Sequence, residues 1–414
     1  MEQKHHYIQR EKYQQFLRKT IGLPAIKIIT GMRRCGKSSL MVMFRDELIE
    51  KGIEQRHLYY RKFDDELEND LPDYRGLIDD VKSKVEIGPG TFILLDEIQD
   101  VEGWERAVTS FFENGSDLYI TGSNAKLLSS ELSTKLSGRY MDIEVLPLNF
   151  REFIEFRRSI GDGSDSEALF ERYYRNGGLP AVALLNESQE DLVNTMIMGI
   201  FNTVYVKDVL KRNSVRNVSL MDNISRFLMK DIGNRVSVKN AAGFLTSKGM
   251  KNASTPQTIE NYISMLEAAF LFHRAKRLDS ETRTYLITTE KFYGNDLGIR
   301  NCIVGMKEED LDGVLENIVF MELKFRYGDV STFNVDRYEV DFFVKGRDGP
   351  EYYQACCDLN RSETFEREVR PLKSLDDNYP KTIITWVGYP LRDIDGIRVI
   401  NVRDWLTGIS PARP

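Results

Sequence analysis

Eight residues near the start of the chain constrain its fold more than any other feature. Residues 31–38, with the sequence GMRRCGKS, satisfy the pattern G-x-x-x-x-G-K-[ST] in full. They follow an apolar run at residues 25–30 and precede a helix-forming stretch, which is the context that this pattern needs. Gly31 and Gly36 allow the backbone to curl so that successive N–H groups point at phosphate oxygens. We therefore expect a phosphate-binding loop at residues 31–38, called the phosphate loop below.

A second signal follows further along the chain. Residues 92–97, FILLDE, predict a buried strand that ends in two carboxylates. We assign Asp96 and the Ser38 hydroxyl to Mg²⁺, Glu97 to the attacking water and Lys37 to the phosphates of ATP. A chance glycine turn does not explain two signals in this order. The pair of motifs indicates binding and hydrolysis of ATP.

Weaker candidates follow the next two predicted strands. Ser123 and Asn124 lie where the γ-phosphate is expected, and they either sense it or cap the next helix. Arg139 is either an arginine finger, offsetting transition-state charge, or a surface arginine. The predicted catalytic residues are Lys37, Glu97 and Arg139. The predicted nucleotide contacts are Gly31, Arg34, Cys35, Gly36, Lys37, Ser38, Ser39, Ser123 and Asn124.

The remaining pattern predicts an α/β protein of several domains, since 414 residues exceed one ordinary core. Short apolar runs alternate with helical patterns up to about residue 149, as in a parallel sheet covered by helices. Strands are expected at residues 25–30, 57–63, 91–96, 118–122 and 141–145. The stretch to residue 216 looks helical and is interpreted as a lid. The predicted domains are residues 1–150, 151–216, 217–287 and 288–414.

The third segment has the plan of a winged helix-turn-helix. Its last helix is expected to start at Pro256 behind a cap at Ser254 or Thr255, with an apolar face at Ile259, Tyr262, Ile263 and Leu266. In the fourth segment we expect helices at residues 314–326 and 364–375, and strands at residues 330–334, 339–345, 352–357 and 381–387.

Charge and composition narrow the functional classes. The net charge of −7 opposes indiscriminate coating of nucleic acid, but residues 205–255 carry ten basic residues against three acidic ones. Duplex DNA is therefore a candidate partner through the winged helix, with Lys248, Lys251 and Arg274 as candidate contacts to its phosphates. The alternative is that this module only packs between domains and that its lysines form a solvated face. No apolar run reaches membrane-spanning length and no secretion signal is visible, so we expect a cytoplasmic protein without membrane contact. The cysteine and histidine spacing predicts no zinc site.

With these motifs the chain resembles a prokaryotic group of AAA+-type ATPases, the archaeal-ATPase-like proteins with an uncharacterised C-terminal domain. The resemblance spans nearly the whole chain. It rests on the sequences TGMRRCGKS at 30–38, LDEIQD at 95–100 with Trp104, TGSN at 121–124, SGR at 137–139, LPLNF at 146–150 and NGGLP at 176–180. It implies an AAA+ core, a winged-helix segment and a C-terminal fold similar to restriction endonucleases.

In such a nuclease-like site, acids and a lysine on adjacent strands converge on Mg²⁺ and the attacking water. Asp341 and Gln354 match, with Glu316 or Glu322 as further acids, but Cys356 replaces the lysine and supplies no fixed positive charge. We therefore expect a degenerate module at Glu322, Asp341 and Gln354.

Three functional hypotheses follow from the sequence. The first is a Mg²⁺-dependent ATPase or ATP-driven switch, acting as a single chain or as a homo-oligomer, that is coupled to a partner. The second is a DNA-binding or nuclease-related defence factor gated by ATP. The third is a scaffold that binds ATP with little turnover.

Overall fold

The chain forms two compact units in its computed structural model. Unit 1 comprises residues 1–146 with 268–270, and unit 2 comprises residues 147–267 with 271–414. The structure describes residues 8–64, 71, 73–125, 138–237, 241–243, 245, 255–279, 284–335 and 337–408.

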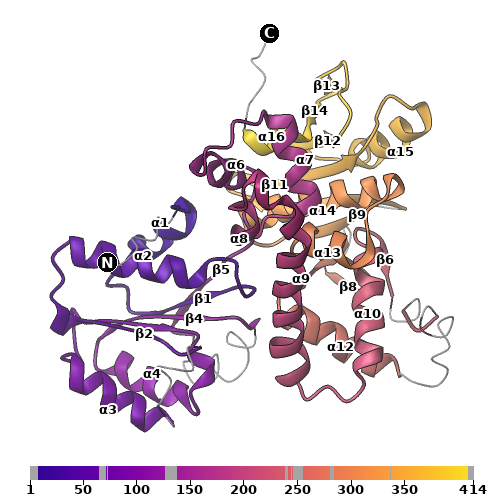
Figure 1. The fold of residues 1–414 in the computed structure, drawn as a ribbon. Helices are drawn as coiled ribbons and strands as arrows, with labels where there is room; N and C mark the ends of the chain where they lie inside the picture. The colour runs from indigo at the N-terminus through magenta and orange to yellow at the C-terminus, as the bar shows by residue number, and fades with distance from the viewer. Residues whose placement is uncertain are drawn as a thin grey trace. The chain divides into compact units, whose positions relative to one another are not determined.

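Unit 1 is a five-stranded parallel sheet with helices on both faces. The strand order is β2-β3-β4-β1-β5. Helices α1 and α2 lie on one face and α3 and α4 on the other (Figure 1). The strands are β1 Ile26–Thr30, β2 Leu58–Lys62, β3 Phe92–Asp96, β4 Asp117–Gly122 and β5 Tyr140–Glu144. The helices are α1 Glu11–Lys19, α2 Lys37–Glu50, α3 Tyr74–Lys84 and α4 Trp104–Glu113. The α/β prediction is confirmed, and each predicted strand end is within one residue of the observed one.

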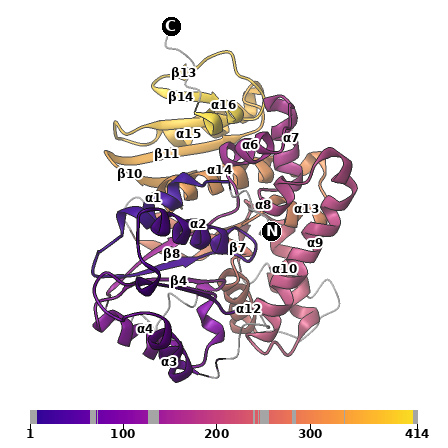
Figure 2. The same cartoon turned by 60° about the vertical axis from the view of Figure 1, so that its left-hand side comes forward.

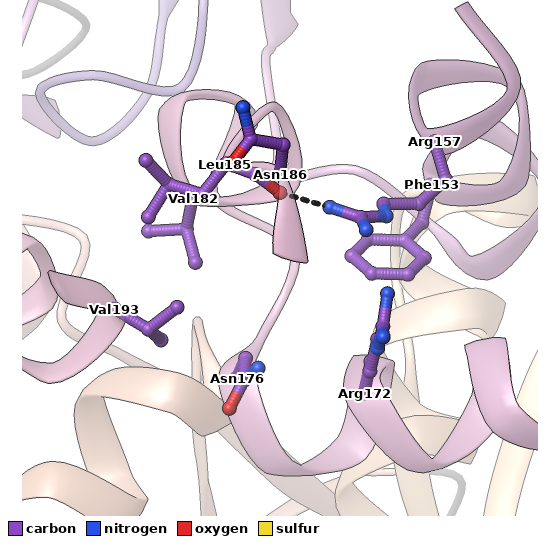
Figure 3. Close-up of a pocket in the computed structure, with 8 residues that line it drawn as sticks. All are labelled: Phe153, Arg157, Arg172, Asn176, Val182, Leu185, Asn186 and Val193. Carbon is purple, nitrogen blue, oxygen red and sulfur yellow. Dashed lines mark hydrogen bonds between the residues drawn. The ribbon is translucent and has the colours of Figure 1, made fainter. Parts of the chain in front are cut away.

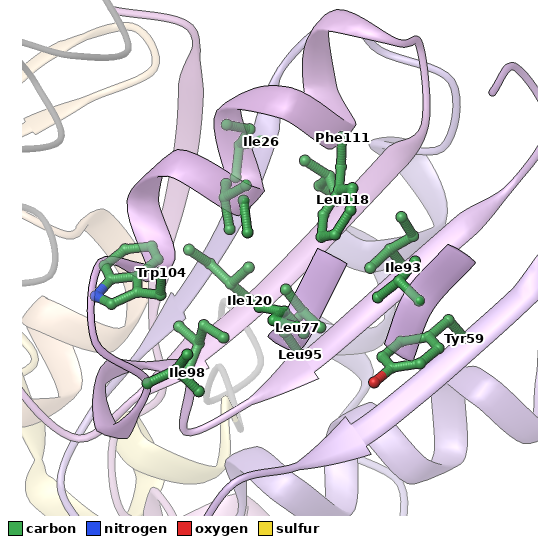
Figure 4. Close-up of a cluster of buried hydrophobic side chains, with 14 of the residues drawn as sticks. Ile26, Tyr59, Leu77, Ile93, Leu95, Ile98, Trp104, Phe111, Leu118 and Ile120 are labelled. Atoms are coloured by element: carbon green, nitrogen blue, oxygen red, sulfur yellow. The ribbon is translucent and has the colours of Figure 1, made fainter. Parts of the chain in front are cut away.

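The strands of unit 1 are apolar because most of them are covered on both faces. Every residue of β1 and of β3 is buried. Leucines and isoleucines of β3 and β4 pack against Leu77 of α3 and Phe111 of α4 (Figure 4). Two buried residues of β1 and β3 carry ionisable side chains, Lys27 and Asp96. Lys27 of β1 forms an ion pair with Asp117 of β4, so its ammonium is compensated. This core fixes the carboxyl ends of the strands at one edge, where the phosphate loop begins.

Unit 2 starts with helices, as predicted for residues 149–216. They are α6 Phe150–Ser159, α7 Ser166–Asn176, α8 Pro180–Ala183, α9 Val193–Thr203 and a π-helical stretch Val204–Lys211. The later helices are α10 Val218–Lys230, α12 Pro256–Ala268, α13 Leu297–Val304, α14 Leu311–Tyr327, α15 Ser362–Lys373 and α16 Val402–Thr407.

A nine-stranded mixed sheet runs through the rest of unit 2. Its order is β13-β14-β12-β11-β10-β9-β7-β8-β6, and α14 packs against β10 and β11 (Figure 2). The strands are β6 Arg235–Val236, β7 Phe272–Asp279, β8 Tyr285–Gly294, β9 Ser331–Val335, β10 Tyr338–Gly346, β11 Gly349–Cys356, β12 Lys381–Thr385, β13 Asp393–Ile394 and β14 Ile397–Asn401. The elements predicted after residue 314 are all present, and β13 and β14 were missed.

The sheet continues across the predicted boundary between residues 287 and 288. That boundary falls inside β8, and β7 pairs in parallel with β9 beyond it. Helix α12 does start at Pro256, where Thr255 Oγ1 accepts the Thr258 N–H at 3.2 Å. Ile259, Ile263 and Leu266 are buried, as expected for one apolar face. The cap alternative Ser254 lies outside the described residues. The winged-helix and restriction-endonuclease-like assignments stay predictions.

Among the helices in the described part of the chain, none is both long enough and apolar enough to cross a lipid bilayer.

Candidate functional site

The phosphate loop joins β1 to α2 through backbone shapes that favour glycine. Gly31 has φ 141° and Gly36 has φ 106°, both in the left-handed half of φ space. A Cβ atom on Gly31 would clash with the Val145 carbonyl oxygen. Arg34 also has positive φ, at 69°, and is exposed at the turn of the loop. The loop therefore keeps a strained, curled backbone whose amides precede the N-terminus of α2.

Lys37 lies at the centre of the site. Its ammonium donates to the Gly31 carbonyl at 2.9 Å and to the Met32 carbonyl at 3.1 Å. It also forms an ion pair with Glu97 at 3.2 Å, and both side chains are almost fully buried. Burial would lower the pKa of Lys37, but the Glu97 carboxylate raises it above its ordinary value. The ammonium therefore stays charged and is held by the Glu97 carboxylate.

Asp96 is the last residue of β3 and Glu97 follows it, and their carboxyl groups have different hydrogen-bond partners. The Thr121 hydroxyl of β4 donates to Asp96, and the Glu97 N–H donates to the same hydroxyl at 2.9 Å. Glu97 Oε2 accepts the Gln99 amide at 2.6 Å and the Ser123 N–H at 3.1 Å. Thr121 thus joins the two acids, a role that its position in the sequence TGSN at 121–124 does not reveal.

The two carboxyl groups also differ in charge state. Burial raises the pKa of Asp96. Burial would raise the pKa of Glu97 too, but Lys37 and Gln99 outweigh it and hold the pKa at about 2. Glu97 has a left-handed backbone with φ 57°, a strained conformation for a residue other than glycine. Strain and a perturbed pKa at one buried residue are features of functional sites.

The residues beside Asp96 fit a divalent cation. Asp96 Oδ2 is buried and makes no hydrogen bond to the residues that the structure describes. The Ser38 hydroxyl lies close enough to bond the Asp96 carboxyl and lower its pKa. A hydroxyl and an uncommitted carboxylate oxygen are hard donors of the kind that Mg²⁺ prefers. Ser38 and Asp96 are therefore brought together as the sequence predicted.

The other predicted residues of unit 1 lie in two places. Ser123 and Asn124 are buried directly after β4, at the same edge of the sheet as Glu97, while Ser39 is half-buried in the first turn of α2. Arg139 precedes β5 and is exposed; its carbonyl accepts the Ile26 N–H at the start of β1. That is the opposite end of the strands, roughly 16 Å from the phosphate loop at 3.3 Å per residue. Arg139 therefore does not reach a phosphate held by its own loop.

Arg10 is a contact that the sequence analysis missed. This buried guanidinium donates to the Cys35 carbonyl of the phosphate loop at 3.1 Å and to the Leu146 carbonyl at 2.9 Å. Nothing in the residues around Arg10 signals this role, because its partners are backbone carbonyls far away in the sequence. Arg10 therefore ties the phosphate loop to the segment after β5 through two backbone carbonyls.

In unit 2 the structure brings together two of the three predicted nuclease-like residues. The Asp341 N–H donates to Gln354 Oε1 at 3.1 Å on the adjacent strand. Glu322 is instead paired with Arg326 at 2.7 Å, and its other charged neighbours are Glu152 and Arg151. The structure therefore does not bring Glu322 together with Asp341 and Gln354. Cys356 is buried, as a member of an apolar cluster.

Arg274 does not have the environment of a phosphate contact. Its guanidinium is paired with Glu260 and Glu267 at 2.7 Å and with Glu290 at 2.6 Å. Contact with DNA would require breaking these ion pairs. Lys248 and Lys251 lie outside the described residues.

A small cavity in unit 2 is lined by two arginines that are bound to other groups of the protein. It is lined by Phe153, Arg157, Arg172, Asn176, Val182, Leu185, Asn186 and Val193 (Figure 3). Arg157 donates to the Ala183 and Leu185 carbonyls, and both arginines pair with Asp162. The cavity therefore belongs to the packing of α6, α7 and α8.

Comparison with known proteins finds two family models that match separate parts of the chain. The family model described as an AAA domain matches residues 24–154, and a domain of unknown function, DUF8612, matches residues 167–310. An uncharacterised protein of Haemophilus influenzae is 35% identical over 403 residues, covering 96% of this chain and 98% of its own length. An uncharacterised protein of Methanocaldococcus jannaschii is 30% identical over 379 residues, covering 87% and 82%.

Among solved structures, the Walker-type ATPase of Pyrococcus abyssi matches 72% of this chain and 96% of its own, at 15% identity and a TM-score of 0.47.

Proposed function

Because the chain belongs to the same family as these Haemophilus and Methanocaldococcus relatives and carries an AAA domain, we propose that it binds ATP with Mg²⁺ and hydrolyses the terminal phosphoanhydride bond. One observation carries the proposal. A curled glycine loop, a buried lysine and two buried acids meet at the carboxyl edge of a parallel sheet. This is the set of groups that phosphoryl transfer needs, because its catalysis is mainly positioning and charge stabilisation.

Each residue has a separate task in this proposal. The amides of the phosphate loop bind the phosphates, and Lys37 exchanges Glu97 for phosphate oxygens. Glu97, released from the ammonium, then orients the attacking water and accepts its proton. Ser38 and Asp96 hold Mg²⁺, which when bound neutralises phosphate charge. Ser123 and Asn124 lie beside Glu97, where a polar group can respond to the γ-phosphate.

Replacing Lys37 by Ala tests the binding step. We expect the affinity for ATP with Mg²⁺ to fall at least about 100-fold, because the loop loses its one buried cation beside the phosphates. Isothermal titration calorimetry on the folded protein measures this. Lys51→Ala, at the exposed end of the same helix, is the control and should bind normally. Unchanged heats for Lys37→Ala would contradict the proposed site.

Arg139 can serve as a finger only on a neighbouring copy of the chain. We expect Arg139→Ala to lower turnover at least about 1,000-fold and Lys37→Ala to be inactive, whereas a mixture of the two regains activity because each supplies what the other lacks. Phosphate release measured against protein concentration tests this, with exposed Arg56→Ala as the control. An inactive mixture, or normal turnover of Arg139→Ala at every concentration, would reject a homo-oligomeric site.

The partner coupled to hydrolysis remains a prediction. The excess of basic residues between 205 and 255 makes duplex DNA the first partner to consider. The ion pairs of Arg274 reduce the number of cations available for it.

A further inference from the structure

A buried lysine in unit 2 is surrounded by three carboxylates. Lys291 lies on β8 with its side chain 7% exposed. Its ammonium contacts Asp341 at 3.0 Å, Glu316 at 3.1 Å and Glu339 at 3.3 Å. Glu316 belongs to α14, and the other two acids belong to β10. We call these four residues the Lys291 cluster.

The cluster is held by further hydrogen bonds on each side. The Tyr293 hydroxyl donates to Glu316 at 3.1 Å. Arg235 of β6 pairs with Glu339, and the Ala355 N–H donates to Asp341 at 3.1 Å. Each acid therefore has a second donor besides Lys291.

The acids of the Lys291 cluster favour the protonated form of the Lys291 side chain. Burial would lower the pKa of Lys291, but Asp341 and Glu316 raise it well above its ordinary value. Burial also raises the pKa of Glu316 above its ordinary value. A second positive charge reaches the acids from Arg235, which pairs with Glu339.

The space between the three acids is taken by an ammonium. The Lys291 nitrogen lies 3.0–3.3 Å from all three carboxylates, and Mg²⁺ would need the same oxygens at about 2.0–2.1 Å. No group of three or more Asp, Glu, His or Cys side chains is arranged to hold a metal in the part of the chain that the structure describes. On the adjacent strand, neutral Gln354 donates to Glu368 at 2.6 Å instead of adding a charge.

We propose that Lys291 is the resident cation of this carboxylate cluster and takes the place in which a divalent ion would otherwise lie. Unit 2 then keeps a carboxylate site in a closed, metal-free form, which binds no Mg²⁺ and cleaves no phosphodiester. The ammonium joins β8 to α14 and β10 whether or not the site in unit 1 holds a nucleotide. This proposal does not depend on the ATPase function.

Removing the ammonium should turn the cluster into a metal site. In Lys291→Gln the acids lose their cation, and buried carboxylates without a counter-ion are strongly destabilising. A divalent cation restores the compensation, so we expect the variant to bind a single Mn²⁺ and the wild type to bind none in the absence of nucleotide. We also expect the variant to melt at a lower temperature and Mn²⁺ to reverse that loss.

The experiment uses the full-length, nucleotide-free chain. Electron paramagnetic resonance counts bound Mn²⁺, and thermal melting with and without Mn²⁺ measures rescue. Lys291→Gln combined with Asp341→Asn should lose the new site. Lys307→Gln, which removes an exposed lysine paired with exposed Glu309, should behave as the wild type in both measurements.

Two results would overturn the proposal. One is a folded Lys291→Gln protein that takes up no Mn²⁺. The other is a wild-type protein that binds Mn²⁺, or nicks plasmid DNA with it, in a manner lost in Asp341→Asn. The wild-type measurement decides the question even where Lys291→Gln does not fold.

Discussion

Glu97→Gln is expected to lower the rate of ATP hydrolysis at least about 100-fold while ATP affinity stays equal or increases, because a general base typically contributes that much. The amide cannot accept the proton of the attacking water. It also no longer forms an ion pair with Lys37, which Glu97 contacts at 3.2 Å, so the ammonium is free for the phosphates. Phosphate release and calorimetry on the same preparation separate the two effects.

Glu102→Gln is the matched control, since this exposed acid follows β3 in the same loop and should leave turnover unchanged. Normal hydrolysis by Glu97→Gln would show that another group activates the water. Loss of binding in the same variant would show that Glu97 is needed to keep the loop folded.

Gly177→Ala is expected to destabilise unit 2 by roughly 3–5 kcal/mol, combining backbone strain with a steric clash. Gly177 has φ 78°, and a Cβ atom there would overlap the Asp296 carboxylate. That carboxylate accepts the Gly178 N–H at 2.7 Å and caps α13 through the Ile299 N–H at 3.0 Å. Asp296 is only 5% exposed, so the side chain has no open solvent to move into, and this burial raises its pKa to about 6 despite these bonds.

Thermal melting measures the effect, and a drop of about 10 °C corresponds to this energy for a domain of this size. Gly161→Ala is the control, with φ 82° and nothing within 4 Å of the added Cβ. It should lose only about 1 kcal/mol from backbone strain. Equal melting temperatures of the two variants would contradict a role of the Asp296 contact.

One physical reason explains why part of the candidate site could be predicted from the sequence. Parallel strands end at the same edge of a sheet, so motifs after β1, β3 and β4 had to converge. Lys37, Asp96 and Glu97 meet there, as predicted. Arg139 precedes its strand, and the same rule removes it from its own phosphate loop. The sequence left open whether Arg139 would act on a phosphate held by its own chain or by a neighbouring copy. The pairing of Ile26 with Tyr140 excludes the first alternative.

The contacts that escaped prediction depend on tertiary packing. Arg10 binds carbonyls, and every residue has a carbonyl, so no side-chain pattern marks its partners. Lys291 meets its acids only because β7, β8, β9 and β10 belong to one sheet. The predicted domain boundary at residue 287 divides this single sheet into two parts. The boundary was placed there because the pattern before residue 287 is mainly helical, whereas strands alternate with helices after it. Glu316 and Glu322 both lie on α14, and only packing decides which one faces Asp341.

The strand order of unit 2 has a consequence for synthesis on the ribosome. Strand β7 pairs with β9, and β12 pairs with both β11 and β14, so the last partner emerges only with residues 397–401. Unit 1 acquires all its strands by residue 144. The nascent chain therefore carries a completed N-terminal sheet while the later strands still expose unpaired edges, the period in which aggregation competes with folding. The unpaired strand edges are therefore exposed mainly during the second half of translation.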